Sequence, residues 1–381
     1  MAYESIDKLQ KVLQDDVFHY AKDSKKAAGR ALGTIVEIIT FYLLKAWGLN
    51  DSISIERGLG EYGNPEITHN VEYSLHPVIS NYLIKFPNDG STVTSNRVLR
   101  LLNSSEVNLA GFIPKKSINL LSKDRTLRNA CTLAVSDKSY MLCSFDSQTS
   151  AEFLLRVYEQ LHKPYAIFEC KRVGVEDGMK KGPQTIEKAK QGAYVARTVS
   201  SLQKIRNESG DMLGIIYKSD GTLISKPFAE LMEEVIASDD AELLRRFVLT
   251  VGVVSNHGNW FTSNNQNKEM KVLAQSYDWL LFLTDNGLAQ FIEKLLLKPL
   301  VKHEVIKEAF HLSYSADKKK NTFTKVQMNL LADMMLLRYF SENLNEIESW
   351  FEVISPAGKT IETLKAELQE LKTKNWKEIL K

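Results

Sequence analysis

Residues 165–171 read Tyr-Ala-Ile-Phe-Glu-Cys-Lys, an apolar run that ends in a carboxylate and an ammonium two residues apart. Side chains alternate along a β-strand, so Glu169 and Lys171 are expected on one face and Cys170 on the other. A charged pair at the end of an apolar strand costs free energy unless a ligand such as a divalent metal or a phosphate uses it. The stretch therefore predicts a strand that carries two charged groups into a functional site. A simple salt bridge at a strand end is the alternative.

The composition is that of an ordinary globular protein. The chain has 381 residues, of which 44% are hydrophobic and 25% charged, so it is long enough for two domains or for one domain with insertions. Its three cysteines form no Cys-x-x-Cys pair, which favours a reducing compartment and argues against a zinc ribbon. The first residues show no secretory signal, and no run of 18 apolar residues suggests a membrane span. We therefore expect a cytoplasmic protein.

Positive charge is concentrated in two segments, although the formal net charge is +2. Residues 163–206 contain ten basic and four acidic side chains, and residues 85–128 contain eight basic and three acidic ones. Basic segments on a nearly neutral protein suit a polyanion better than a small neutral substrate. Solvated surface lysines are the plainer explanation for either segment alone.

The first third of the chain alternates between helical and strand patterns. Residues 25–47 predict a helix with Glu37 near its middle and Gly48 just after its end, and residues 52–56 predict a short strand. Residues 58–63 match Gly-x-Gly-x-x-Gly. A dinucleotide fingerprint requires a helix to begin there, whereas Asn-Pro and a β-like run at 67–73 follow, so a turn is expected instead.

The remaining patterns predict a mixed α/β fold with a central sheet flanked by helices. We expect strands at 139–145, 153–158, 165–172, 212–217, 247–254 and 277–283, and helices from Pro183 to about 206 and at about 288–297. Beyond residue 300 the pattern is helical throughout. Leucine and isoleucine at 361, 364, 368 and 371 form a seam that favours packing within the chain over a dimerising coiled coil. We assign a core of residues 1–299 with a basic insertion at about 58–138, and a helical C-terminal region of residues 300–381.

The order of these elements resembles that of the PD-(D/E)XK nuclease superfamily. It runs helix, strand, insertion, a hairpin that ends in Glu169-x-Lys171, helix and two strands. The phrases at 168–174, 182–184 and 190–194 look similar to one family of type II restriction endonucleases, and the resemblance covers about residues 25–260. It implies a restriction-endonuclease-like core, hydrolysis of phosphodiester bonds in double-stranded DNA with Mg²⁺, and a homodimer, since a palindromic site needs two symmetric active sites.

The resemblance also assigns roles to residues. Glu169 would be a metal ligand, and Lys171 would orient the attacking water or stabilise the transition state. Two carboxylates from neighbouring strands suit Mg²⁺, which prefers oxygen ligands and lowers the pKa of bound water. The second carboxylate is open. Glu152 lies 17 residues before Glu169, a hairpin-compatible spacing about a turn at 161–164. Asp146 has the family's usual residue type but lies 23 residues before Glu169, and Asp137 is farther still.

Supporting residues follow from the same resemblance. Glu37 fits a glutamate on the first helix that reaches the metal through water, and Gln191 fits a glutamine on the helix after Glu-x-Lys. Phosphate contacts are expected from basic residues that position the duplex without reading sequence, namely Arg172, Lys180, Lys181, Lys188 and Lys190. Base reading is expected from arginine, asparagine and lysine side chains of the insertion, namely Asn96, Arg97, Arg100, Lys115 and Lys116.

Two other functions remain open at this stage. One is a repair or junction nuclease on the same core, and the other is a DNA-binding protein without catalysis in which Glu-x-Lys arises by chance. The histidines show no metal-binding spacing, and His69 and His76 would lie on opposite faces of a regular strand.

Overall fold

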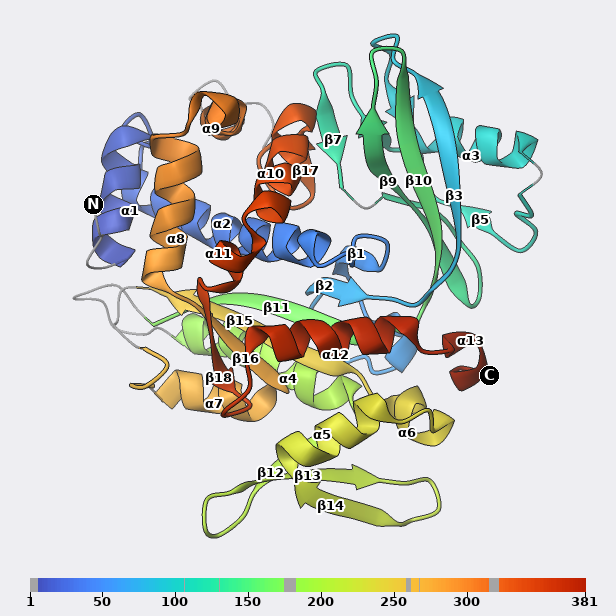
Figure 1. Cartoon of the computed structure of the whole chain (residues 1–381), viewed down its shortest axis with the longest axis vertical. Coiled ribbons are helices and arrows are strands. Elements are labelled where there is room, and N and C mark those ends of the chain that lie inside the picture. The colour runs from blue at the N-terminus through green and yellow to red at the C-terminus, as the bar shows by residue number, and fades with distance from the viewer. Residues whose placement is uncertain are drawn as a thin grey trace.

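A six-stranded sheet forms the centre of the protein, with strands in the order β1-β2-β11-β15-β16-β18 (Figure 1). The computed structural model describes residues 6–105, 107–129, 131–174, 183–257, 262–266, 268–314 and 322–381. The strands of this sheet are β1 (Ile53–Arg57), β2 (Val71–Leu75), β11 (Ala166–Val173), β15 (Leu249–Asn256), β16 (Trp279–Leu283) and β18 (Phe351–Ser355). Strand β11 is antiparallel to β2 and parallel to β15, so it lies in the interior of the sheet.

Helices cover both faces of the central sheet, and alternate residues of β11 face different layers. Ala166 and Phe168 belong to the large hydrophobic core that includes α2 (Ser24–Ala46), whereas Val173 packs with Ala193 of α4 (Pro183–Val199). The same core includes α12 (Ile361–Thr373), and the α4 face includes α7 (Lys268–Ser276). Both faces of β11 are therefore covered, which explains its nearly continuous apolar run.

Helix α2 forms as the sequence predicts. The Asp23 carboxylate accepts a hydrogen bond from the backbone N–H of Lys26, which caps the first turn, and Gly48 follows the helix with a φ of +75°. Among the described helices, α2 has the length and composition that could span a membrane, but 67% of its most apolar window is buried inside the protein. It is therefore a core helix of this fold.

An inserted β-structure projects from the core between β2 and β11, at the upper right of Figure 1. Its five-stranded sheet has the order β3-β10-β9-β8-β5. Its elements are β3 (Val78–Pro87), β4 (Val93–Thr94), α3 (Ser95–Ser104), β5 (Ile113–Pro114), β6 (Asn119–Leu121), β7 (Thr126–Arg128), β8 (Cys131–Val135), β9 (Ser139–Gln148) and β10 (Glu152–Leu161).

Two predictions about this region are wrong. The insertion was expected at 58–138, but β2 belongs to the central sheet, and β9 and β10 belong to the insertion. The strand at 153–158 was expected to form a hairpin with β11. Instead β10 pairs with β3 on one edge and with β9 on the other, so neither edge is available to β11.

A smaller unit follows α4, at the bottom of Figure 1. It consists of a three-stranded antiparallel sheet and two helices, namely β12 (Gln203–Arg206), β13 (Met212–Tyr217), β14 (Leu223–Pro227), α5 (Phe228–Ala237) and α6 (Ala241–Arg246). Helix α4 begins at Pro183 as predicted but ends at Val199, because the chain enters β12 soon afterwards. The predicted strand at 212–217 is confirmed, although it lies outside the central sheet.

The C-terminal region was expected to be helical throughout, but it also contains strands. Besides its helices it contains β17 (Gln327–Asn329), which pairs with β7 of the insertion, and β18, which pairs with β16 at an edge of the central sheet. The remaining elements of the described chain are α1 (Ile6–Asp16), η1 (Gly60–Tyr62), α8 (Asp285–Ile292), η2 (Glu293–Leu297), η3 (Val301–His303), α9 (Glu304–Ser313), α10 (Leu330–Glu342), α11 (Leu344–Glu348) and α13 (Trp376–Ile379).

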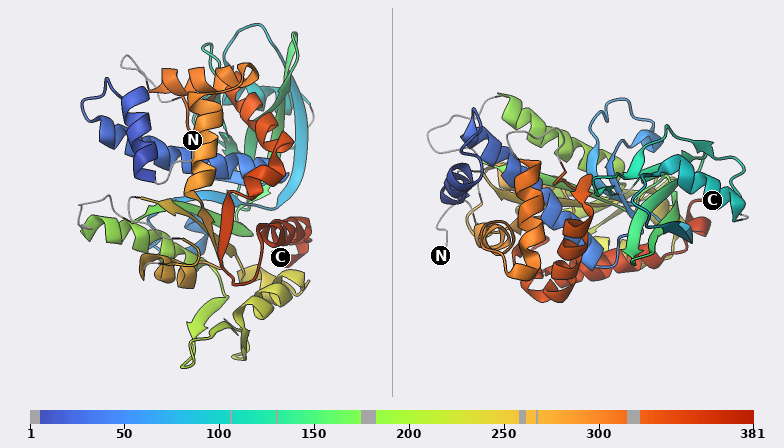
Figure 2. Two further views of the ribbon diagram at one scale, coloured as in Figure 1. Left: turned by 60° about the vertical axis from the view of Figure 1, so that its left-hand side comes forward. Right: turned by 90° about the horizontal axis from the view of Figure 1, so that it is seen from above.

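The C-terminal region is therefore part of the core and not a separate domain. Leu364, Leu368 and Leu371 are fully buried in the same hydrophobic core as α2, so their seam packs within the chain. Helix α12 contacts α5 and β18. In both views of Figure 2 the red C-terminal helix lies against the rest of the protein, and α1 and the inserted sheet lie at opposite ends. The predicted mixed α/β class with a central sheet and flanking helices is confirmed.

Candidate active site on strand β11

Glu169 and Lys171 project from the same face of β11, as the alternation of side chains requires. The Lys171 Nζ lies 3.4 Å from Glu169 Oε2, and His69 Nε2 lies 3.2 Å from Glu169 Oε1. The Glu169 side chain is 0% exposed, whereas Lys171 is 21% exposed. The carboxylate is thus enclosed beneath a lysine that reaches solvent.

The carboxylate of Glu169 is buried without full compensation. Within the described part of the chain, neither of its oxygens accepts a hydrogen bond of good geometry, and the Tyr277 hydroxyl and His69 Nε2 are also buried and unsatisfied. Burial and the negative charge of Glu169 raise the pKa of Tyr277 well above its ordinary value, so this hydroxyl stays protonated. Buried polar atoms without partners are costly, and their concentration around one carboxylate is typical of a site that takes a cation or a polar ligand.

Gly192 of α4 allows this close packing. A Cβ at this position would lie 2.7 Å from the Tyr277 hydroxyl, 3.5 Å from Lys171 Cε and 3.7 Å from Glu169 Cδ. The first distance is too short for any real side chain. A glycine is therefore needed for α4 to pack directly over the Glu-x-Lys pair.

A hollow of about 630 Å³ opens at the carboxyl end of β11. Most of its charged lining is cationic, and it is lined by Lys26, Arg30, Lys171, Arg172, Glu37, Cys170, His257 and small residues of α2. Lysine and arginine side chains around a concave surface are suited to bind phosphate oxygens. The ammonium of Lys171 connects this hollow with the enclosed carboxylate of Glu169.

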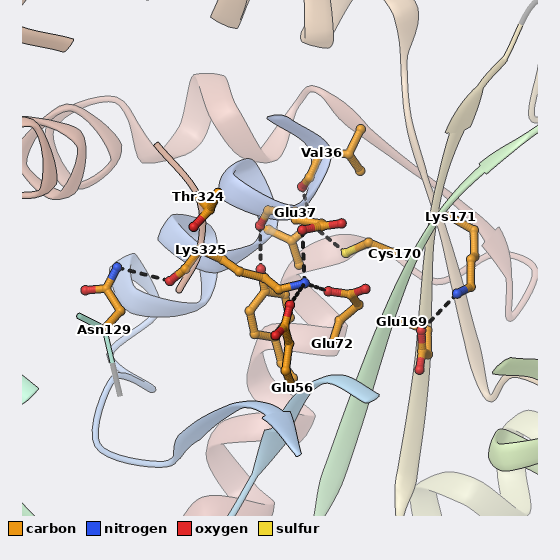
Figure 3. A network of polar contacts seen from close by, with 12 residues as sticks. Val36, Glu37, Glu56, Glu72, Asn129, Glu169, Cys170, Lys171, Thr324 and Lys325 are labelled. Carbon is orange, nitrogen blue, oxygen red and sulfur yellow. Dashed lines mark hydrogen bonds and ion pairs between the residues drawn. The ribbon is translucent and has the colours of Figure 1, made fainter. Parts of the chain in front are cut away.

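Three glutamates surround a buried lysine beside this pair (Figure 3). The Nζ of Lys325 lies 2.9 Å from Glu37 Oε2 and 3.2 Å from Glu56 Oε1, and it also bonds to Glu72. The Lys325 side chain is 4% exposed. Its backbone carbonyl accepts a hydrogen bond of 3.1 Å from the Asn129 side chain, which fixes the turn that carries it.

Glu72 occupies a special position relative to Glu169. The ladder between β2 and β11 ends at the pair Tyr73 and Phe168, so Glu72 and Glu169 are the next residues along their strands. Val71 packs with Ile167 on the α4 face of the sheet, while Tyr73 packs in the main core on the other face. The side chains of β2 on either side of Glu72 therefore point to different faces of the sheet. The side chain of Glu72 consequently points toward Lys325.

The structure does not bring Glu152 or Asp146 to Glu169, contrary to expectation. Both belong to the five-stranded sheet, where Glu152 lies 3.5 Å from Lys85 and Asp146 pairs with Arg156. Glu152 is the first residue of β10, nine residues before the end that leads to β11, which places it about 30 Å away along the strand. Asp137 lies in the turn between β8 and β9 of the same sheet. The error came from the hairpin that does not form.

Glu37 and Gln191 lie near the pair in different ways. Glu37 belongs to the α2 side of β11, toward which Cys170 points, and it lines the same hollow as Lys171. Its carboxylate is bound to Lys325. Gln191 precedes Gly192 on α4 and is exposed. Both residues therefore border the site but do not contact the Glu169 carboxylate in any recorded hydrogen bond or ion pair of the described chain.

The expected phosphate-contacting residues divide into three groups. Arg172 lines the hollow and donates hydrogen bonds of 2.9 Å to Gly29 O and 3.3 Å to Asn256 O, which tie α2 to β15. Lys180 and Lys181 lie outside the described residues. Lys188 and Lys190 belong to α4, but their side chains are outside the described part of the structure.

The expected base-reading residues do not form one surface feature. Asn96 and Arg100 are exposed on α3, and Lys115 and Lys116 are exposed and line a separate hollow of about 460 Å³ that also includes Arg128. Arg97 has a structural role, because its guanidinium donates hydrogen bonds of 2.8 Å to Ser91 Oγ and 2.7 Å to Thr92 O.

Sequence reasoning missed His69, Glu72, Tyr277 and Lys325. The run 67–75 was taken as part of the insertion, although its apolar alternation through Val71, Tyr73 and Leu75 already indicated a core strand. Had it been placed beside β11, Glu72 would have been the nearest acidic candidate. Lys325 carries no such signal, because its partners lie 253 and 288 residues earlier in the chain.

In the described ranges no group of three or more His, Cys, Asp and Glu side chains is arranged to hold a metal ion. The carboxylates that would serve as oxygen ligands are divided between two places, with Glu169 enclosed near His69 and Glu72 bound to Lys325. Comparisons of the chain with protein-family models, with curated proteins and with solved structures find no match.

Proposed function

We propose that this protein is a Mg²⁺-dependent endonuclease that cleaves double-stranded DNA at a specific site, in the manner of type II restriction enzymes. The observation that carries the proposal is the position of Glu169 and Lys171. They are the fourth and sixth residues of the interior strand β11, whose antiparallel neighbour β2 carries an acidic residue, Glu72, at the position next to Glu169. The order α2, β1, β2, inserted sheet, β11 and α4 keeps the helix, strand, insertion, Glu-x-Lys strand and helix of that resemblance, although the expected hairpin does not form and β12 to α6 precede β15.

The donor set supports a hard divalent cation. Among the described residues, Glu169 offers two buried oxygens without hydrogen bonds, and Glu72 on the neighbouring strand would join it as a Mg²⁺ ligand once released from Lys325. The metal would supply a bound water of lowered pKa and would neutralise charge on the phosphate. Glu37 is a further carboxylate, on the α2 side of β11, and it too is bound to Lys325.

The protein's own groups have separate tasks in this proposal. Lys171, two residues from Glu169, would hold a scissile phosphate oxygen or orient the attacking water. The cationic lining of the hollow, including Lys26, Arg30 and Arg172, would bind the DNA backbone next to it. The Tyr277 hydroxyl, which stays protonated, and the His69 ring would keep the Glu169 carboxylate in place.

The test is incubation of the purified chain with phage DNA, with and without 10 mM Mg²⁺, about the concentration that saturates weak Mg²⁺ sites. The proposal expects discrete fragments that require the metal. Glu169→Gln should retain the fold and lose cleavage, while the matched control Glu152→Gln, a glutamate at the far end of β10, should cut normally.

Each other outcome has a definite meaning. A smear or cleavage at branched structures alone would favour a repair or junction nuclease. DNA that stays intact at all metal concentrations, with binding still detectable by gel shift, would favour a DNA-binding protein without catalysis. Equal activity of Glu169→Gln and the parent chain would overturn the assignment of the site.

A further inference from the structure

A second charged hollow lies near the opposite end of β11 from Glu169. It has a volume of about 590 Å³, a size at which small-ligand sites are found. Its lining comes from η1, the turn before β11, the end of α4 and the segment after it, β12, β13 and α6, and it includes Glu61, Lys163, Ser201, Arg245 and Arg246. Segments from distant parts of the chain thus converge on one concave surface.

Three of the lining side chains are cations with no acidic partner. Within the described chain no carboxylate lies at ion-pair distance from Lys163, Arg245 or Arg246. Arg245 donates a hydrogen bond of 2.9 Å to the carbonyl of Ile379, which anchors α6 to α13 but neutralises no charge. Among the described residues, the fold therefore gives these cations no counter-ion.

The one acidic residue of the lining is already engaged. The Glu61 carboxylate makes a two-point contact with the Arg57 guanidinium, at 3.2 Å and 3.1 Å. A bidentate pair of this kind leaves little capacity to neutralise other cations. The hydroxyl of Ser201 adds a further unsatisfied group, because its oxygen is buried without a hydrogen-bond partner in the described structure.

The electrostatic state of Lys163 is consistent with a missing anion. Burial and the charges of Arg245 and Arg246 lower the pKa of this lysine to about 8, and Glu61 opposes the shift only weakly. Like charges brought together in this way destabilise one another unless an anion compensates them.

We propose that Lys163, Arg245 and Arg246 form a binding site for the phosphate group of a small, nucleotide-sized molecule. The chemistry matches a phosphate because three cations and a hydroxyl can all donate to its oxygens. This site lies apart from the Glu169 site and does not depend on the proposed nuclease activity.

The test uses calorimetric titration of the full chain with inorganic phosphate and with adenosine monophosphate at pH 7. Both should bind, and Arg246→Gln and Lys163→Gln should each weaken binding at least about tenfold, since each removes a charge-assisted contact. The matched control is Arg206→Gln, which removes an exposed arginine of β12 whose guanidinium bonds to Gly210 O outside this hollow. Its affinity for both probes should be unchanged.

A second arm separates a small ligand from the DNA backbone. A duplex of about 30 base pairs should bind the parent chain and Arg246→Gln equally in the presence of Ca²⁺. The ionic strength is held at 0.1 M, where the Debye length is about 10 Å. The proposal is overturned if neither phosphate nor the nucleotide binds, or if all three variants bind them alike. It is also overturned if Arg246→Gln weakens duplex binding while phosphate binds neither protein, because the hollow then serves DNA.

Discussion

Lys325 is bound to Glu72 across 253 residues of sequence, and the same ammonium contacts Glu37 and Glu56. Three carboxylates share one buried positive charge, which leaves a net charge of −2 at this place. A turn of the C-terminal region thus supplies the cation that binds Glu72. Glu72 lies on β2 at the position next to Glu169 on β11. In this conformation the ammonium binds the carboxylate that the proposed metal site requires.

Replacement of Lys325 tests this arrangement. Lys325→Met should destabilise the protein by about 3–5 kcal/mol in metal-free buffer, because the partly buried Glu37 and Glu72 and the exposed Glu56 lose their only shared cation among the described contacts. Millimolar Ca²⁺ should restore part of the lost melting temperature, since a divalent ion can take the place of the ammonium. Lys226→Met, which breaks an exposed pair with Glu234, should leave stability almost unchanged and show no such rescue. The absence of a calcium effect on Lys325→Met would contradict the idea that this cluster accepts a divalent ion.

Glu72 is expected to be the second acidic residue of the active site. Glu72→Gln should reduce DNA cleavage at least about 100-fold, because even partners of metal ligands cost 10–100-fold when removed. Asp146→Asn, on the inserted sheet, should reduce it less than about twofold. Cleavage rates on a plasmid, measured at several Mg²⁺ concentrations, provide the comparison. Equal loss in both variants would argue against the placement of Glu72.

Gly192 is expected to tolerate no side chain while Tyr277 keeps its hydroxyl. Gly192→Ala places a Cβ 2.7 Å from that oxygen and should destabilise the protein by about 1–3 kcal/mol and lower activity, because Glu169 and Lys171 lie directly behind. The double variant Gly192→Ala/Tyr277→Phe should recover stability relative to Gly192→Ala alone.

The matched control for this substitution is Gly33→Ala on α2. No atom lies within 4 Å of a Cβ at Gly33, so the change should stabilise the helix by about 0.5–1 kcal/mol. The measurement is the melting temperature of the parent chain, Gly192→Ala, Gly192→Ala/Tyr277→Phe and Gly33→Ala. If Gly192→Ala were as harmless as Gly33→Ala, the packing of α4 over the Glu-x-Lys pair would be looser than the structure indicates.

Glu367 should make the stability of the protein depend on pH. Burial raises the pKa of this carboxyl to about 7, while the hydrogen bond of 2.8 Å from Trp279 Nε1 opposes the shift. The folded state then keeps a proton that the unfolded state releases above its ordinary pKa of about 4.5. Its contribution is fully present below pH 4.5 and is lost as the pH rises through 7.

Glu367→Gln should therefore be more stable than the parent chain by about 1–3 kcal/mol at pH 8 and differ little at pH 5. The amide oxygen can still accept the hydrogen bond from Trp279. Glu378→Gln, which alters an exposed pair with Lys381, should change stability by less than about 1 kcal/mol at either pH. Chemical unfolding at the two pH values decides, and parallel curves for Glu367→Gln and the parent chain would refute the shifted pKa.

Local patterns predicted much of the fold and part of the site. The strand at 165–172, the capped helix at 25–47 and the helix that begins at Pro183 were recognisable because periodicity and capping act over a few residues. Strand pairing was predicted less well. The expected partner of β11 was the preceding strand, whereas the chain inserts a complete sheet and pairs β11 with β2, some 90 residues earlier, and with β15.

By itself, the sequence determined that a largely apolar strand would carry Glu169 and Lys171 on one face, because side chains alternate wherever a strand forms. Tertiary structure decided what surrounds that pair. Separate segments of the chain bring four further residues to the site, namely His69, Glu72, Tyr277 and Lys325. Their positions depend on which strands pair and on the face of the sheet toward which each part of β2 points its side chains. Such contacts arise from packing between elements far apart in the chain, and no local spacing of residues encodes them.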